Sequence, residues 1–172
     1  MEFTKGLNKE EIDDIEKIYK INFPPDYREL LMYTLPISNG FVNWRNKSKE
    51  NIEKITHQMN WPLEGIIFDI EHNGFWVEGW GEKPSDLEDA INIATINYEN
   101  VPKLIPIYGH RYIPSFPFEK GNPIMSVWQT DIIYYGKNLW DYFSVEFGFK
   151  QHHEIDFDNI KKIPFWYDIF MS

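Results

Sequence analysis

Cysteine is absent from the 172-residue chain, and its absence excludes disulfide bonds, thiol nucleophiles and thiolate metal sites. Long apolar runs are missing as well, since no stretch approaches the roughly 20 apolar residues that cross a bilayer. The first residues also lack the basic segment and apolar run of a secretory signal. Together these absences predict a soluble, cytoplasmic protein with no membrane partner.

Basic residues are scarce beside acidic ones, with 17 Lys and Arg against 27 Asp and Glu and a net charge of −10. A nucleic-acid partner is therefore not expected, because phosphate binding needs a basic face. Residues 61–100 hold nine carboxylates and a single lysine, so most of the excess lies in one central stretch. Such a stretch is either a solvated face that maintains solubility or a docking surface for a basic partner.

Aromatic residues are abundant, with 7 Trp, 10 Tyr and 13 Phe making up 17% of the chain. A sequence this rich in bulky apolar groups is not disordered, because burial of those groups offsets the entropy cost of ordering. The length favours one domain with a core of its own. No repeat, low-complexity tract or linker divides the sequence.

Capping residues and apolar spacing predict four helices. Each begins where a side chain can accept an otherwise unpaired backbone N–H, or where proline suits the first helical position. The expected starts are Asn8 with Glu11, Pro25, Ser85 with Glu88, and Asn138 with Asp141. Residues 43–60 are polar and predict a loop or a surface helix.

A β-hairpin is the prediction for residues 66–80, with Asn73-Gly74 as its turn. Further strands are expected over residues 104–108, 123–128 and 131–135, and Pro106 indicates a sheet edge or a bend. Residues 150–172 are too apolar to extend into solvent and are expected to pack back on the body. This order of elements predicts a single α+β domain over residues 1–172, with a mainly antiparallel central sheet flanked by helices.

Few patterns in the sequence point to catalysis or to a metal. His152-His153-Glu154 offers ligand types, but adjacent side chains point apart, so no metal site and no cofactor is predicted. No nucleotide-binding glycine motif and no activated serine pattern is present. His110, with Arg111 and Asp131, is the one candidate for a general base. A buried, hydrogen-bonded His-Arg pair that fixes a loop is the simpler interpretation.

Trp76 and Trp80 are four residues apart, which places them on one face of a regular strand. Packing in the core is the simpler explanation for both rings. A partner-facing surface is the alternative, because tryptophan is common among the residues that dominate binding energy.

Several segments of the chain resemble the bacterial Smi/Knr-type branch of the SUKH superfamily. The opening LNKEEIDDIEKIYKINFPPDYRELLMYTLPISNG is similar to the family's N-terminal signature of a helix, a Pro-Asp-Tyr element that opens a second helix, and a loop ending in Asn-Gly. Other similar segments are GWGEKPSDLEDAINIA, PKLIPIYGHRYIPSFP, GNPIMSVWQTDIIYYGKNLWDYF and VEFGF. The resemblance falls within residues 7–149 and leaves the tail, 150–172, outside it. The Pro24-Pro25 pair departs from the family's single proline.

This resemblance implies a SUKH-like domain whose sheet is flanked by helices. It also implies a non-catalytic immunity protein, a monomer or weak homodimer, that binds and neutralises a cognate secreted polymorphic toxin. The family has no catalytic residues or cofactor to transfer, so none is assigned. A small scaffold or regulatory binding module without a toxin partner is the first alternative, and a hydrolase-like enzyme around His110 is the second.

The acidic central stretch has a candidate role within this interpretation. Many nuclease toxins are basic, and an acidic inhibitor gains attraction and fast association with a basic target. The candidates for contact with the toxin are Asp69, Glu71, Glu78 and Glu82, with Trp76 and Trp80 beside them.

Overall fold

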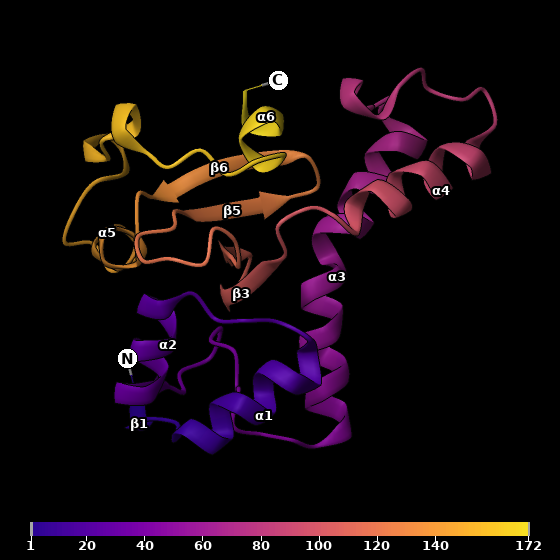
Figure 1. The fold of residues 1–172 in the computed structure, drawn as a ribbon. Coiled ribbons are helices and arrows are strands. Elements are labelled where there is room, and N and C mark those ends of the chain that lie inside the picture. Colours follow the sequence, from indigo (N-terminus) through magenta and orange to yellow (C-terminus); the bar gives the residue numbers. More distant parts are fainter. Residues whose placement is uncertain (1, 172) are drawn as a thin grey trace.

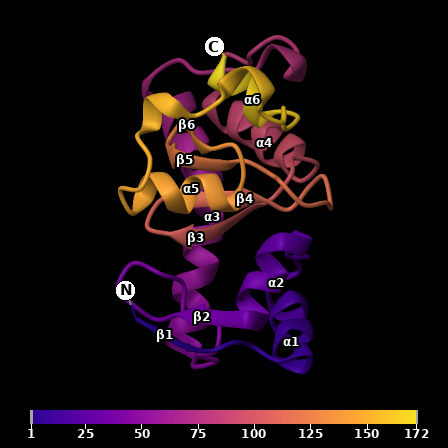
Figure 2. The same cartoon turned by 90° about the vertical axis from the view of Figure 1, so that its left-hand side faces the viewer.

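The computed structural model describes residues 2–171 and arranges them as an antiparallel sheet with helices on both faces (Figure 1 and Figure 2). The helices are α1 (Lys9–Tyr19), α2 (Pro25–Tyr33), α3 (Lys49–His72), α4 (Leu87–Tyr98), α5 (Leu139–Glu146) and α6 (Trp166–Phe170). The strands are β1 (Phe3–Lys5), β2 (Thr34–Pro36), β3 (Leu104–Tyr108), β4 (Arg111–Pro114), β5 (Ile124–Trp128) and β6 (Asp131–Gly136). Short 3-10 helices are η1 (Glu78–Trp80), η2 (His152–Glu154) and η3 (Phe157–Asn159).

The central sheet has the strand order β3-β4-β5-β6, and each neighbouring pair is antiparallel. β3 is an edge strand, and its register shifts between Pro106 and Tyr108. Both features agree with the effect of a proline, which cannot donate a ladder hydrogen bond. β1 and β2 form a separate antiparallel pair. The predicted α+β class with an antiparallel sheet flanked by helices is confirmed.

Each face of the central sheet covers its own hydrophobic core. Successive side chains of β4 point to opposite faces of the sheet. Ile113 therefore packs in the core with α1 and α2, and Tyr112 packs in the core with α4 and α6. Figure 2 shows this arrangement, with the N-terminal elements on one side of the sheet and α4 and α6 on the other. The C-terminal tail packs back on the body as expected, and Trp166 is fully buried.

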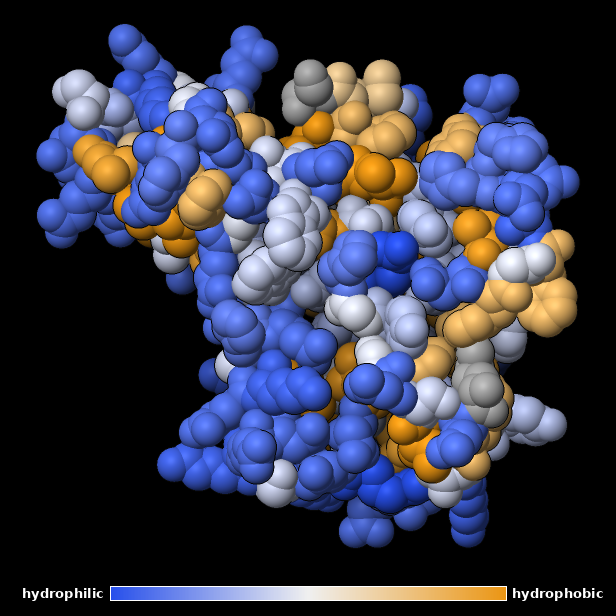
Figure 3. All heavy atoms as spheres, turned by 180° about the vertical axis from the view of Figure 1, so that it is seen from behind, coloured by the Kyte–Doolittle hydropathy of each residue, from blue (hydrophilic) through white to orange (hydrophobic). Residues whose placement is uncertain are grey.

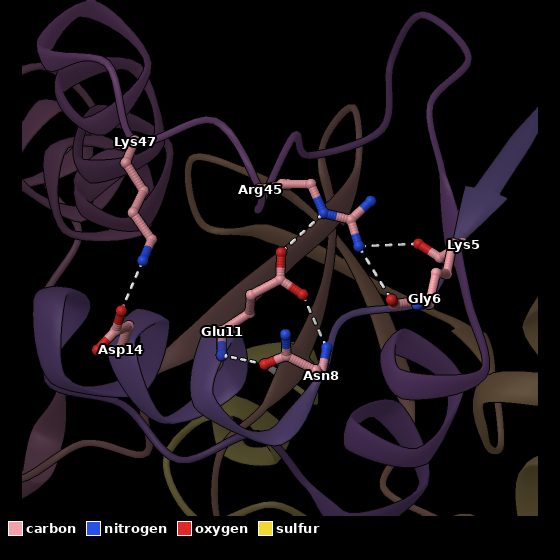
Figure 4. A network of polar contacts seen from close by, with 7 residues as sticks. All are labelled: Lys5, Gly6, Asn8, Glu11, Asp14, Arg45 and Lys47. Carbon is pink, nitrogen blue, oxygen red and sulfur yellow. Dashed lines mark hydrogen bonds and ion pairs between the residues drawn. The ribbon is translucent and has the colours of Figure 1, made fainter.

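The start of α1 is fixed by the capping box expected from the sequence. Asn8 accepts from the N–H of Glu11 at 2.9 Å, and Glu11 accepts from the N–H of Asn8 at 2.8 Å. Arg45 donates to the other carboxylate oxygen of Glu11 at 2.9 Å and to the carbonyls of Lys5 and Gly6 (Figure 4). One guanidinium therefore ties the loop before α3 to the N-terminal segment.

The predicted β-hairpin over residues 66–80 is wrong. Residues 66–70 belong to α3, a 24-residue helix that begins after the N-cap Ser48 and ends at His72. Asn73 ends this helix, and Gly74 follows with a φ of +71°, so the Asn-Gly pair terminates a helix where the sequence suggested a hairpin turn. A short apolar run buried on one side looks the same in a strand and in a helix.

Pro62 lies inside α3, where proline removes the hydrogen bond to the carbonyl four residues earlier. That carbonyl belongs to Gln58, and it accepts instead from the hydroxyl of Tyr112 at 2.9 Å. Burial raises the pKa of Tyr112, so the hydroxyl keeps the proton that it donates. The side chain from β4 thereby replaces the missing helix hydrogen bond and joins α3 to the sheet.

Two further contacts join α3 to the turn between β5 and β6. A Cβ on Gly65 would lie 2.6 Å from the Cα of Gln129, so only glycine allows so close an approach of helix and turn. One turn further along α3, a carboxylate oxygen of Asp69 accepts from the N–H of Thr130 at 2.9 Å and from its hydroxyl at 2.6 Å. The turn is therefore held at a fixed place on the helix.

Of the other predicted helix starts, those of α2 and α5 agree with the structure and that of α4 does not. Asn138 accepts from the N–H groups of Trp140 and Asp141 at the start of α5, as expected. The predicted cap at Ser85 is wrong, because Asp86 is the N-cap and accepts from the N–H of Asp89. Within residues 2–171, no helix has the length and apolarity needed to cross a bilayer.

Candidate functional site

The acidic residues that follow α3 gather on one projecting part of the molecule, which we term the acidic lobe (residues 71–89). It comprises the end of α3, the loop containing η1 and the first turn of α4, and it lies to the upper right in Figure 1. Seen from behind, its surface is mostly hydrophilic (Figure 3). Its exposed carboxylates are Glu71, Glu78, Glu82, Asp86, Glu88 and Asp89.

The loop of the acidic lobe is held by contacts to its own backbone. Trp76 donates its indole N–H to the carbonyl of Gly81 at 2.7 Å. Lys83 donates to the carbonyls of Ile70 and Phe75 at 3.1 and 3.3 Å. The single lysine of residues 61–100 is thus turned toward the backbone of the lobe.

The six exposed carboxylates have few counter-charges. Glu71 lies 3.7 Å from the imidazole of its neighbour His72, and within residues 2–171 none of the six pairs with a lysine or an arginine. Asp86 has a local role as the cap of α4, and Glu88 and Asp89 lie in the first turn, where negative charge favours the helix dipole. Across residues 2–171, the lobe therefore presents carboxylates that no lysine or arginine neutralises in an ion pair.

Asp69 does not belong to this exposed surface, although the sequence placed it among the docking candidates. It is 3% exposed, and besides Thr130 it accepts from the side-chain amide of Asn73. Burial alone would raise the pKa of Asp69, but the hydrogen bonds from Thr130 and Asn73 outweigh burial and hold the pKa below its ordinary value. Asp69 is a buried, charged anchor between α3 and the β5–β6 turn.

Trp76 and Trp80 lie together, but not on a strand. Their rings meet edge to face with centroids 5.3 Å apart, and Trp80 also stacks on Phe165 with centroids 5.9 Å apart. Both rings are half-buried against the core that contains α4 and α6. They fasten the loop of the acidic lobe to the C-terminal tail, which agrees with the packing interpretation.

His110, Arg111 and Asp131 lie near one end of the sheet, but His110 and Arg111 contact different neighbours. Arg111 pairs with Glu146 at 3.2 Å, donates to Ser126 at 2.9 Å and lies 3.8 Å from the ring centroid of Tyr135. The exposed imidazole of His110 meets the edge of Trp128, with ring centroids 6.4 Å apart. Partial desolvation and the neighbouring positive charge of Arg111 lower the pKa of His110.

Two further histidines, His152 and His72, also have contacts that account for them. His152 lies 3.0 Å from the carbonyl of Tyr134, and its ring packs on Tyr135. His72 stacks on Phe68 with ring centroids 4.3 Å apart. Across the described residues, 2–171, no three His, Asp or Glu side chains converge in a way that would hold a metal ion.

An aromatic pocket that the sequence did not reveal lies where α3 meets the β5–β6 turn. It encloses about 300 Å³. Its lining residues are Trp61, Glu64, Gly65, Phe68, Trp128 and Gln129. Trp61 and Trp128 touch, with ring centroids 5.7 Å apart, and Trp128 is 55% exposed. The two rings are far apart in the sequence, so no local pattern could have predicted their contact.

A larger apolar groove, of about 570 Å³, lies between α2, the β1–β2 pair and α5. Its lining residues are Phe3, Leu30, Tyr33, Thr34, Pro36, Phe41, Trp140, Phe143, Phe147 and Phe149. Trp140, Phe143 and Phe147 recur at helical spacing, a signal that would have indicated this face of α5. In Figure 1, α2 and α5 lie on the side of the molecule away from α4, so groove and acidic lobe are separate surfaces.

Comparisons with family models, with curated proteins and with solved structures find no match for this chain.

Proposed function

We propose that this protein is a non-catalytic immunity protein of the cytoplasm that binds and neutralises a cognate secreted toxin, a basic nuclease-type domain, through the acidic lobe. The observation that carries the proposal is that the lobe exposes six carboxylates, and that within residues 2–171 none of them pairs with a lysine or an arginine. The resemblance of several sequence segments to the SUKH superfamily supports the same role.

The charge of the lobe fits a basic partner for a physical reason. A group of like charges on a projecting surface creates a potential that attracts an oppositely charged protein and accelerates association. A nuclease domain must be basic where it binds phosphate. An acidic surface placed against that region competes with the nucleic acid for the same positive side chains.

A scaffold or regulatory binding module without a toxin partner is the second candidate, and the apolar groove beside α5 favours it. Exposed apolar patches of this kind commonly mark sites of protein contact. The neighbouring gene discriminates the two, because an immunity protein is encoded beside its toxin.

The direct test is co-expression with the C-terminal domain of the secreted protein encoded by the neighbouring gene. The toxin domain alone should arrest growth, and this protein should restore growth and be recovered in a complex with that domain. Growth arrest that persists at full expression of this protein, with no complex recovered, would contradict the proposal.

A further inference from the structure

The aromatic pocket at the junction of α3 and the β5–β6 turn combines two features that suit one kind of ligand. Trp61 and Trp128 supply π-electron faces, and Trp128 is 55% exposed at the mouth of the pocket. Glu64 lines the same pocket, with a side chain that is 48% exposed. Tryptophan faces attract cations, and a nearby carboxylate strengthens that attraction.

The charges around the pocket have the same sign. No lysine or arginine lines it, and within residues 2–171 the ion-pair partner of Glu64 is the imidazole of His57, at 3.5 Å. Asp131 lies opposite Trp128 in the register of β5 and β6 and is exposed. The pocket therefore offers carboxylates and aromatic rings without a fixed positive charge.

The geometry of the pocket is fixed by backbone contacts. Gly65 and Gln129, which approach each other closely, both line it, and Gln129 holds a positive φ of 56° in the turn. Asp69 fixes the next residue, Thr130, to α3 through the two hydrogen bonds described above. The backbone that carries Trp128 is thereby held beside α3, so binding need not reorder the turn.

The pocket is also continuous with the acidic lobe. Phe68, which lines the pocket, stacks on His72 at the start of the lobe with ring centroids 4.3 Å apart. The pocket and the start of the lobe are therefore neighbouring surfaces along α3. Its volume of about 300 Å³ is at the small end of ligand sites and suits one side chain.

We propose that the pocket binds an arginine side chain of the protein partner, with the guanidinium over the face of Trp128 and hydrogen-bonded to Glu64. The planar guanidinium suits this site because it stacks on aromatic rings and donates to a carboxylate at the same time. This inference rests on the proposed function for the partner's basic character, and it adds the residue type that the partner inserts.

The test uses a hexa-arginine peptide as the probe and the indole N–H signals of the full chain in NMR spectra. The peptide should shift the Trp61 and Trp128 signals saturably, while the Trp140 signal on the far side of the molecule stays unchanged. A hexa-citrulline peptide, which keeps the shape but lacks the charge, should not shift them. Equal effects of both peptides, or no shift of the Trp61 and Trp128 signals, would overturn the proposal.

Two variants locate the binding. Trp128→Leu and Glu64→Gln should each weaken hexa-arginine binding by about 2- to 30-fold, and Trp140→Leu, at a residue of similar exposure, should not. Unchanged affinity of both variants would mean that the peptide binds only the acidic lobe, and the proposal would fail. If hexa-arginine does not bind the pocket but the toxin domain is bound normally, the arginine site is refuted and the proposed immunity function is not. If hexa-arginine binds the pocket but no toxin complex forms, only the immunity function is refuted.

Discussion

Tyr112→Phe tests how α3 accommodates its internal proline. The substitution removes one hydroxyl from a side chain that is 2% exposed and leaves the Gln58 carbonyl without a donor, because Pro62 has no N–H. An unpaired carbonyl inside a protein costs about 1–3 kcal/mol. Since Gln58 is only half-buried, we expect a loss of about 1–2 kcal/mol in the free energy of unfolding.

A double-mutant cycle with Pro62→Ala isolates this contact. Alanine at position 62 supplies the N–H that the Gln58 carbonyl lacks, so the hydroxyl of Tyr112 becomes nearly redundant. Tyr112→Phe should then cost less than about 0.5 kcal/mol in the Pro62→Ala background, with a coupling energy of about 1 kcal/mol.

Urea unfolding of the four proteins, followed by circular dichroism, gives the four free energies. With a slope of about 2 kcal/mol per molar urea, the expected loss moves the midpoint by roughly 0.5–1 M. Equal costs of Tyr112→Phe in the two backgrounds would refute the account, because the hydroxyl would then act independently of the proline.

Two predictions concern the turn that carries Trp128. Asp69→Asn should lower the free energy of unfolding by about 1–3 kcal/mol at pH 7, because the hydrogen bonds from Thr130 lose their charged acceptor. The pKa of Asp69 in the folded protein lies below its unfolded value of about 3.9. This contribution to stability is therefore present at neutral pH and is lost as the pH falls from about 4 through the folded pKa. A stability difference between wild type and Asp69→Asn that persists undiminished at low pH would contradict this prediction. Gly65→Ala should cost about 1–3 kcal/mol in urea unfolding, because its Cβ would lie 2.6 Å from backbone of Gln129. Gly79→Ala, which would meet nothing within 4 Å, is the matched control.

The parts of the fold that the sequence predicted are those with local causes. A capping side chain and the N–H groups that it accepts lie within three residues of each other, so Asn8 and Asn138 were readable without tertiary information. Pro106 likewise restricts its own strand to an edge. The apolar tail could be expected to pack inward because no exposed segment keeps so many aromatic groups in water.

The misassigned segment shows where local signals fail. Residues 66–70 form an apolar run whose length suits a strand, and Asn73-Gly74 suits both a hairpin turn and a helix end. Pro62 also lies inside the helix that replaces the hairpin, although a proline ordinarily interrupts a helix. The compensation for Pro62 comes from Tyr112, a residue 50 positions later in the chain, and no pattern near the proline announces it.

The candidate site was predictable only in its charge. The acidic excess of residues 61–100 was plain in the sequence, and most of those carboxylates are exposed. The sequence could not tell that Asp69 faces inward, because its donors come from Thr130 on another element. The aromatic pocket was unpredictable for the same reason, since Trp61 and Trp128 meet only after α3 docks on the sheet.

The affinity of the toxin domain for two charge-reversed variants tests the role of the acidic lobe most directly. One variant carries Glu78→Lys, Glu82→Lys and Glu88→Lys. Its matched control carries Glu10→Lys, Glu50→Lys and Asp158→Lys, which reverse exposed carboxylates elsewhere and change the net charge equally. Both variants should be measured at low and high salt, because screening weakens exposed charge interactions beyond about 10 Å at 0.1 M.

The lobe variant should lose at least about 10-fold in affinity at low salt, mostly through slower association, and the loss should shrink as salt is raised. The control variant should bind nearly as wild type. Equal losses in the two variants would show that only net charge matters, and unchanged affinity of the lobe variant at both salt concentrations would contradict docking through the acidic lobe.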